Sequence, residues 1–265
     1  MPDRKSPMTK SPLIFFILVF ALSIPFYLLG ISGARLPGLS ILPASALMAF
    51  MPMCAALILV YRQRGIDGIN ALLTHAFDFS MHNGMRWILA ALLFIPVVCT
   101  LEFLVLWLIG IDIPLPQIEP GPATFIFIAF FIGAIGEELG WQGYAYPALR
   151  TKHSTLIAAL ILGVIWALWH VIPFFQLGRS PYWIFWHSLS AVALRIIIVW
   201  LYENTRHSVY IAVLFHTMIN VSWALFPISG SYYDPFITFL ILTFAVGLIG
   251  FFYGPKTLKQ VAPSA

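Results

Sequence analysis

About eight apolar stretches follow one another along the chain, and each is long enough to cross the hydrocarbon core of a membrane as a helix. They occupy residues 12–32, 41–61, 87–111, 122–146, 155–176, 182–202, 208–227 and 235–253. Charged residues make up 9% of the 265-residue chain, whereas soluble domains carry about 25%. The sequence therefore predicts an all-α integral membrane protein of about eight transmembrane helices, with one domain over residues 1–265.

The first apolar run resembles a signal peptide, because Arg4, Lys5 and Lys10 precede it. It is too long for the apolar core of a signal peptide and has no clear cleavage site, so we expect it to be a retained span. The stretch from Arg62 to Met85 is too polar to span, and we expect a loop with a short interfacial helix there. Its apolar residues at helical spacing are Ile66, Ile69, Leu72, Leu73, Ala76 and Phe77.

Basic residues are concentrated on one set of alternate loops. The other set carries only Arg35 and Arg179, while Arg195 falls within a span. Loops rich in Lys and Arg remain in the cytoplasm, so we expect an integral protein of a prokaryotic-type plasma membrane with both termini cytoplasmic. The basic residues on the expected cytoplasmic side are Arg4, Lys5, Lys10, Arg62, Arg64, Arg86, Arg150, Lys152, Arg206, Lys256 and Lys259.

The net charge of +4 does not indicate a nucleic-acid partner, because the basic residues are spread over short loops and form no basic face. Cys54 and Cys99 both lie in apolar runs and lack the spacing of zinc ligands. We interpret them as small buried hydrophobic residues. The expected surroundings of the protein are therefore the lipid bilayer.

Glu137 and Glu138 lie side by side inside the fourth apolar run. An ionised carboxylate at the centre of a bilayer costs at least about 2.5 kcal/mol, so both must be paired, protonated or solvated in a polar cavity. Adjacent residues of a helix point about 100° apart. We therefore expect one carboxylate to do chemistry while a neighbouring polar group holds the other. Burial favours the neutral form of a carboxyl group, which is how a Glu becomes a general base near neutral pH.

Two later apolar runs also carry polar side chains. Trp166 and His170 share a helix face at i,i+4, and so do His216 and Asn220. A His and an Asn one turn apart suit the stabilisation of an oxyanion, although the same residue types also join helices by hydrogen bonds. Counting along straight helices places His170 roughly 10 Å too far outward for a shared site if its helix starts at Thr155. A later start or a tilted helix would reduce this offset.

Together the three clusters resemble the CPBP family of intramembrane proteases, which includes the type II CAAX prenyl proteases and bacterial proteins linked to bacteriocin processing and self-immunity. The family pattern is EExxxR, then aromatic-xxx-His, then HxxxN or HxxxD, each in a separate helix. The matching segments are Glu137 to Gln142, Trp166 to His170, and His216 to Asn220, all within residues 125–223. The resemblance implies helices bundled around an intramembrane polar cavity, with endopeptidase activity on protein or prenylated CAAX-type peptides.

The resemblance and the chemistry of the residues imply the same roles. Glu137 and His170 would position and deprotonate a water molecule. His216 and Asn220 would stabilise the oxyanion, and Glu138 would orient the groups around it. Substrates would reach a cavity open toward the cytoplasm or the lipid.

The first motif departs from the family at its last position, where Gln142 stands in place of Arg. Gln can form hydrogen bonds but cannot neutralise a carboxylate. Arg195 is an alternative source of that charge from another helix, because a buried Arg in lipid requires a partner. It could instead pair with Glu203. His187 lies two turns before Arg195 and is expected to be structural rather than to line the cavity.

Whether a metal takes part is open from the sequence. His170, His216 and Glu137 could form a three-ligand zinc set with one open position, but no two of them lie within one helix turn. The family has also been described as glutamate-dependent and free of metal, and we favour this second reading.

Two other functions remain open. Gln142 favours a catalytically silent membrane protein that recruits a partner or confers bacteriocin self-immunity. Intramembrane Glu and His residues also build proton relays, and Glu102 or Asp234 could serve a carrier. A carrier can carry an internal repeat, and the sequence has none that we detect. The endopeptidase is the prediction.

Overall fold

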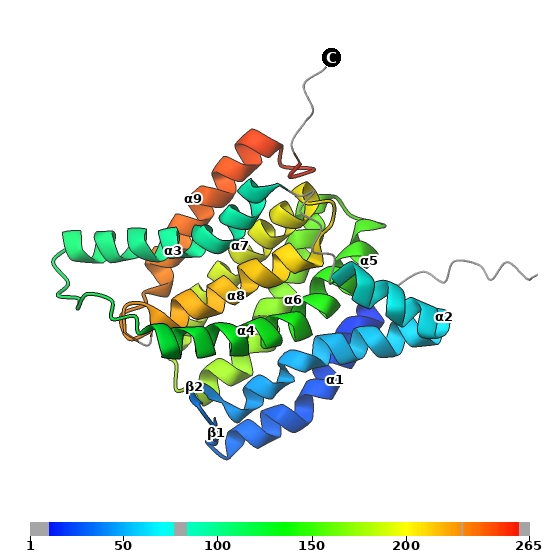
Figure 1. Ribbon diagram of the computed structural model, residues 1–265, viewed down its shortest axis with the longest axis horizontal. Helices are drawn as coiled ribbons and strands as arrows, with labels where there is room; N and C mark the ends of the chain where they lie inside the picture. Colours follow the sequence, from blue (N-terminus) through cyan, green and yellow to red (C-terminus); the bar gives the residue numbers. More distant parts are fainter. Residues whose placement is uncertain (1–10, 77–83, 229, 260–265) are drawn as a thin grey trace, which may run out of the picture.

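The computed structural model describes residues 11–76, 84–228 and 230–259, and Figure 1 shows a bundle of helices in this part of the chain. Arg4, Lys5, Lys10 and Phe77 lie outside the described residues. The α-helices are α1 (Pro12–Ile31), α2 (Met51–Ala76), α3 (Met85–Leu108), α4 (Pro120–Gly140), α5 (Tyr146–Arg150), α6 (Thr155–Gln176), α7 (Pro181–Asn204), α8 (Val209–Leu225) and α9 (Pro235–Tyr253). The other elements are β1 (Arg35–Leu36), β2 (Leu39–Pro43), the 3₁₀-helix η1 (Ala44–Phe50) and the π-helical turn η3 (Trp141–Ala145).

Within the described residues, seven helical stretches are long and apolar enough to cross a membrane. The remaining long apolar run forms α8, whose 17 residues are at the lower end of the range for a spanning helix. The prediction of an all-α integral membrane protein is confirmed. Helix α8 is shorter than the predicted span 208–227, because its backbone turns extended at Phe226.

Polar and proline residues mark the helix starts as expected. The side chains of Ser154, Ser180 and Ser208 each accept a hydrogen bond from the third helical residue, as N-caps do. Asp234 accepts from two amides of α9. Because these residues satisfy amides that a helix leaves unpaired, the spans begin close to where the sequence predicts.

The region of the second span differs from the prediction. The chain first forms an antiparallel hairpin of β1 and β2 and then the 3₁₀-helix η1, so α2 begins only at Met51. We expected a loop with a short interfacial helix between Arg62 and Met85. The first half of this stretch is helical instead, since α2 continues to Ala76. Gly65 has φ 61°, which Gly adopts readily, and this position divides α2 into two legs. The second leg begins at Ile66, where the short interfacial helix was expected.

The fourth span also runs further than predicted. Helix α4 passes into the π-helical turn η3 directly after the Glu pair and then into α5, which ends at Arg150. Turns of this kind are inserted residues inside α-helices and are frequent at functional sites. The turn follows the point at which α4 packs most closely on its neighbour, described below.

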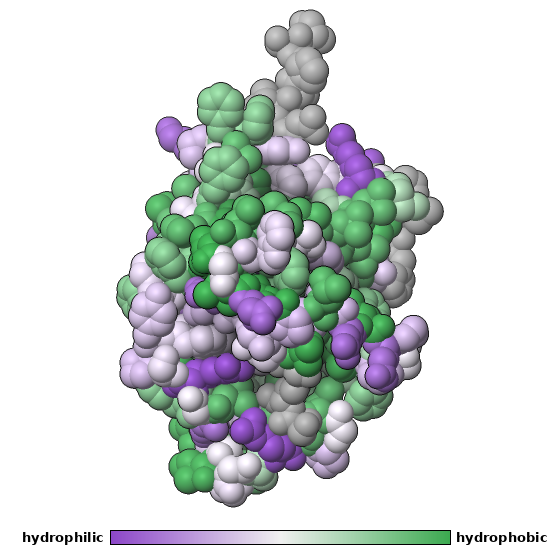
Figure 2. Space-filling model, turned by 90° about the vertical axis from the view of Figure 1, so that its left-hand side faces the viewer, coloured by the Kyte–Doolittle hydropathy of each residue, from purple (hydrophilic) through white to green (hydrophobic). Residues whose placement is uncertain are grey.

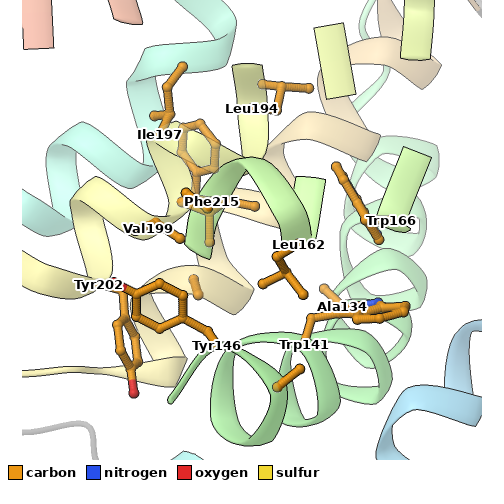
Figure 3. Packing of buried hydrophobic residues seen from close by; sticks show 14 of the residues in the cluster. Ala134, Trp141, Tyr146, Leu162, Trp166, Leu194, Ile197, Val199, Tyr202 and Phe215 are labelled. Atoms are coloured by element: carbon orange, nitrogen blue, oxygen red, sulfur yellow. The ribbon is translucent and has the colours of Figure 1, made fainter. Parts of the chain in front are cut away.

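A single large cluster of aromatic and aliphatic side chains joins the helices. Figure 3 shows part of it, including Tyr146 and Tyr202, whose rings meet edge to face at a centroid distance of 5.5 Å. The outer surface is also apolar: Phe244 of α9 is 70% exposed and Phe251 is 80% exposed. Figure 2 shows hydrophobic residues over much of one face, with hydrophilic residues between them. Apolar exposure on this scale is what a lipid-facing surface requires.

The two ends of the bundle differ in charge. At one end, the Thr155 amide donates to the carbonyl of Lys256, and Arg150 lies 3.8 Å from Glu203. Glu203 therefore pairs with Arg150 and not with Arg195. At the other end lie the hairpin of β1 and β2, the start of α7 and the end of α6. Arg35 and Arg179 are there, while the first end carries Arg62, Arg64, Arg86, Arg150, Lys152, Arg206, Lys256 and Lys259.

Candidate active site

Glu137 and Glu138 lie on α4 where it packs closely on the chain before it. A side chain at Gly136 would come within 2.8 Å of the Ala49 carbonyl oxygen, and one at Gly140 within 2.4 Å of Pro52. Two glycines at this spacing let backbones approach closely inside a membrane. The close packing fixes α4 on both sides of the Glu pair, and both carboxylates are buried.

Glu137 is held by one side chain and faces two others. Its Oε2 accepts a hydrogen bond of 2.7 Å from the indole Nε1 of Trp166. Its Oε1 lies 4.0 Å from Nε2 of His170 and 3.9 Å from Nε2 of His216. The three spans that carry polar residues therefore meet around one oxygen atom.

The hydrogen bonds of the two imidazoles define which ring nitrogen faces Glu137. Nδ1 of His170 lies 2.8 Å from the carbonyl oxygen of Trp166, and a carbonyl only accepts, so Nδ1 carries the proton. Nδ1 of His216 lies 2.8 Å from Oε1 of Glu138 and donates in the same way. In the neutral form of each ring, Nε2 therefore presents a lone pair to Oε1 of Glu137; in the protonated form, Nε2 is a donor. With both rings neutral, three acceptor atoms then face one space, namely Oε1 of Glu137 and the Nε2 atoms of His170 and His216. A molecule that donates protons, such as water, fits between them.

Glu138 has a different environment. It is completely buried, and its Oε2 accepts from Nη1 of Arg195 at 2.7 Å while Oε1 accepts from His216. Arg195 is also completely buried, on α7. A side chain at Gly163 would come within 3.2 Å of the Cβ of Arg195, so the glycine lets α6 and α7 pack closely there. The two adjacent carboxylates thus have different surroundings, as expected. Glu138 accepts a hydrogen bond on each oxygen, whereas Oε1 of Glu137 faces open space.

Trp166 touches most of these groups at once. Its ring meets His170 at 5.2 Å and His216 at 5.3 Å, both edge to face. The guanidinium of Arg195 lies 4.3 Å from its centroid, within cation–π range. Sequence reasoning placed Trp166 beside the imidazole of His170 but missed its hydrogen bond to Glu137. The signal available was that a Trp in a membrane span needs an acceptor for its N–H.

These groups line a cavity of about 230 Å³. Glu137, His170, His216 and Asn220 all contribute to its wall. The structure gives Asn220 no hydrogen bond to another described side chain. The remaining wall is largely apolar and includes Leu36, Leu42, Phe130, Phe174, Leu177 and Trp223, so the cavity extends toward the hairpin end of the bundle.

Comparison with known proteins agrees with this arrangement. A family model for the type II CAAX prenyl endopeptidase Rce1-like group matches residues 119–222, the region that holds all three motifs. Over 237 residues the chain is 27% identical to a CAAX prenyl protease 2 of Methanococcus maripaludis, covering 83% of this chain and 86% of the relative. In this region, and over most of its length, the chain is therefore similar to CAAX-type prenyl endopeptidases. The two similarities support an intramembrane endopeptidase in general.

A second relative is a lysostaphin resistance protein A of Staphylococcus haemolyticus. The two are 25% identical over 177 residues, which cover 62% of this chain and 45% of the relative. The chain therefore spans less than half the length of that protein.

The departure at Gln142 has a structural counterpart. The Gln142 side chain is completely buried, and neither of its polar atoms has a hydrogen-bond partner among the described residues. Gln142 therefore forms no hydrogen bond to either carboxylate of the Glu pair. The positive charge beside Glu138 comes from Arg195, on a different helix.

We expect Gln142→Met to leave peptide cleavage unchanged and to raise the stability of the protein by about 1 kcal/mol, because unpaired buried polar atoms are destabilising. Thermal unfolding in detergent, followed by tryptophan fluorescence, measures the change. Gln63→Met is the control, since Gln63 has a partner in Tyr144 at 3.0 Å and its loss should lower stability. A loss of stability in Gln142→Met as large as that of Gln63→Met would contradict the assignment.

Two further residues have defined surroundings. His187, which could be structural or line the cavity, lies in the cavity wall, and its Nδ1 is 3.2 Å from the hydroxyl of Tyr233. Glu102 was considered for an ion path. It instead accepts from the Asp234 amide at 2.5 Å and the Thr238 hydroxyl at 2.7 Å, so it ties α3 to the start of α9.

The helix of His170 does begin at Thr155, so a later start does not account for its place beside Glu137. The helices do not run parallel, as α3 and α9 in Figure 1 illustrate. Counting residues along parallel axes therefore overestimates the offset.

The described residues do not form a zinc site as they are placed. They contain no group of three or more His, Cys, Asp or Glu side chains positioned to hold a metal ion. Zinc ligands lie about 2.0–2.2 Å from the metal, which puts neighbouring ligand atoms roughly 3.5 Å apart. The Nε2 atoms of His170 and His216 lie further than this from Oε1 of Glu137, at 4.0 and 3.9 Å.

Proposed function

We propose that this protein hydrolyses peptide bonds within the membrane by means of a water molecule that Glu137 activates. The observation that carries the proposal is the meeting of three acceptors: Glu137 Oε1 and the Nε2 atoms of His170 and His216. Separations of 3.9 and 4.0 Å are too long for direct hydrogen bonds. They suit a bridging water, which donates to two acceptors at once.

In the proposed reaction, His170 and Glu137 orient the water through its two O–H groups. Glu137 takes one proton as the oxygen attacks the carbonyl carbon of the substrate. The carbonyl oxygen becomes an oxyanion, which accepts hydrogen bonds from the Asn220 amide and from His216 when its Nε2 is protonated. The proton on Glu137 then passes to the nitrogen of the leaving group, the C–N bond breaks, and Glu137 is restored as a carboxylate.

The buried pair of Arg195 and Glu138 supports this cycle without touching the substrate. Glu138 keeps the Nδ1 proton of His216 in place, so that Nε2 faces the cavity. Arg195 neutralises Glu138, and the low-dielectric surroundings make this pairing strong. His216 therefore faces the substrate with a fixed orientation.

The wall of the cavity favours an apolar peptide segment as the substrate. Leucine, alanine, phenylalanine and tryptophan side chains dominate it, which suits substrates that are themselves embedded in the membrane. A prenyl group is a further apolar ligand for this wall, in line with the name of the Methanococcus relative. Prenylated and unprenylated peptides are therefore both candidates.

The test is cleavage of matched prenylated and unprenylated peptides by the purified protein in lipid nanodiscs. Wild type, Glu137→Gln and His216→Ala are compared with and without a zinc chelator. Cleavage that both substitutions abolish and the chelator leaves intact supports the proposal. If the chelator abolishes cleavage and added zinc restores it, the site is a metal centre and the proposed metal-free mechanism is wrong. No cleavage by folded wild type would favour the silent partner-binding or self-immunity protein.

We further propose that both termini lie in the cytoplasm, because the end of the bundle rich in basic residues should remain there. The cavity extends to the opposite end, near Arg35 and Arg179. With this orientation, substrates enter from the outer side or from the lipid; the second of these routes is one of the two expected from the sequence.

The orientation predicts different labelling of two exposed loop residues. In intact cells, Asp112→Cys should react with a membrane-impermeant maleimide, whereas Lys152→Cys should react only after permeabilisation. Both positions are exposed, and Cys54 and Cys99 are replaced by alanine to remove background. The reverse pattern would place the cavity on the cytoplasmic side.

A further inference from the structure

His187 is a polar group in the cavity wall that the proposed reaction does not use. It lies on α7, one aromatic ring away from the candidate catalytic residues. Its imidazole meets Phe174 at a centroid distance of 4.6 Å, and Phe174 in turn stacks on His170 at 5.8 Å. All three side chains line the cavity, whose wall is otherwise largely apolar. A peptide bound at Glu137 can therefore reach His187 without bringing it to the reacting atoms.

The ring of His187 is fixed by aromatic packing and by one hydrogen bond. Trp183, one turn earlier on α7, stacks on it at a centroid distance of 4.4 Å and an interplanar angle of 14°. Tyr233, in the segment before α9, packs against both rings, and its hydroxyl lies 3.2 Å from Nδ1 of His187. Since Nδ1 is occupied, Nε2 is the ring nitrogen left for a ligand, and the described residues give it no partner.

The neighbours of Tyr233 decide in which direction its hydroxyl donates. This hydroxyl interacts with the hydroxyls of Ser190 and Thr238. Ser190 donates its own proton to the carbonyl oxygen of Pro235 at 3.2 Å, and Thr238 donates to Oε2 of Glu102 at 2.7 Å. A hydroxyl carries only one proton, so both groups offer lone pairs to Tyr233 and nothing else. Tyr233 is therefore the donor in this cluster.

The direction of donation determines what His187 offers to the cavity. Because the proton of Tyr233 is committed elsewhere, its oxygen accepts the hydrogen bond from Nδ1 of His187. In the neutral imidazole the other nitrogen, Nε2, then carries no proton and is an acceptor. Such an acceptor discriminates between ligands: a substrate group that donates to it is bound, whereas an apolar group leaves it unpaired.

We propose that His187 is a specificity-determining residue, whose Nε2 accepts a hydrogen bond from a hydroxyl or amide side chain of the substrate, and that Tyr233 positions its ring. This rests on the proposed function, which places the scissile bond at Glu137. Only Phe174 separates the imidazoles of His187 and His170. Because an extended peptide rises about 3.3 Å per residue, the selected side chain lies roughly two or three residues from the scissile bond. The protein thus prefers an apolar peptide with one donating side chain at that position.

The test measures binding of dansylated apolar peptides that carry either valine or threonine at one position, moved in steps along both sides of the central bond. Both residues are β-branched, so each pair differs in a hydroxyl group and hardly in shape. The parent is Glu137→Gln in phosphatidylcholine nanodiscs, which binds without cleaving, and fluorescence anisotropy reports the affinity. His187→Phe, His187→Gln and Tyr233→Phe are added to this parent in turn. Tyr182→Phe is the matched control, because Tyr182 is 61% exposed on α7 and lies outside the cavity wall.

We expect the parent to bind threonine roughly tenfold more tightly than valine at one position of the peptide, the value of one hydrogen bond in an apolar wall. His187→Phe should abolish this preference without weakening the binding of the valine peptides, and His187→Gln, which keeps an acceptor, should retain part of it. Tyr233→Phe should reduce the preference, because Nδ1 loses its partner, and Tyr182→Phe should leave it unchanged. With Glu137 restored, the same preference should appear in kcat/KM.

Equal affinity of the parent for threonine and valine at every position would overturn the proposal, as would an unchanged preference in His187→Phe. If His187→Phe weakens the threonine and valine peptides equally, His187 packs the cavity wall and selects nothing, which also overturns it. A threonine preference that depends on His187, in a wild-type protein that cleaves none of the peptides, would overturn the proposed endopeptidase and leave the binding site at His187 standing.

Discussion

Glu137→Gln is expected to reduce the rate of peptide cleavage by about 10²- to 10⁴-fold, the usual contribution of a general base. The substitution keeps the shape of the side chain and still offers an oxygen to the Trp166 indole, which donates to Oε2 of Glu137. What it removes is the ability to accept a proton from water. The loss should therefore appear in kcat, with little change in KM, and in single-turnover measurements as well as at steady state.

Glu102→Gln is the matched control, because Glu102 is also a completely buried membrane carboxylate but lies outside the proposed machinery. It should keep its cleavage rate within a few-fold of wild type. If Glu137→Gln cleaves at the wild-type rate, Glu137 is not the base. If both variants lose activity equally, the effect reflects loss of a buried charge in general and not chemistry at Glu137.

Arg195→Met is expected to destabilise the fold by about 3–5 kcal/mol, because it leaves Glu138 buried without its positive partner. Both side chains are completely buried and their ion pair is 2.7 Å long. Replacing both residues removes the unpaired charge, so Arg195→Met combined with Glu138→Gln should recover much of the lost stability. Glu138→Gln alone should also destabilise, since Arg195 would then be the uncompensated charge.

Unfolding in mixed micelles of increasing SDS content measures the four stabilities of this double-mutant cycle. The coupling between the two positions should be large, on the order of 2 kcal/mol or more. Additive effects of the two substitutions would show that the pair is not coupled. The double variant should still cleave poorly, because His216 loses the carboxylate that fixes its Nδ1 proton.

Much of the fold could be predicted from apolar length alone. The spans from Pro12, Thr155 and Pro235 begin at the residues where the sequence predicts, because a Ser or Asp cap precedes each of them. The second span could not be predicted as well, since residues 41–50 are apolar enough for a helix but form a strand and a 3₁₀-helix. Hydropathy does not distinguish these backbone conformations.

The membership of the candidate site could largely be predicted, but its connections could not. The spacing of Trp166 with His170, and of His216 with Asn220, places each pair on one face. Nothing in that spacing shows that Trp166 donates to Glu137 or that Arg195 reaches Glu138 from α7. These contacts depend on how closely helices pack, which the small residues Gly136, Gly140 and Gly163 decide in three dimensions.

The source of the charge beside Glu138 bears on how such proteins are recognised. The first motif has Gln at position 142, where the family pattern has Arg. A sequence search that requires Arg at this position would therefore reject this chain. Arg195, 57 residues after Glu138, meets the same electrostatic need. In this structure, the second carboxylate is paired with one cation, and a helix that borders the Glu pair carries it. For a sequence that lacks Arg in the first motif, the position of a buried arginine in the folded bundle is therefore a better criterion than the motif itself.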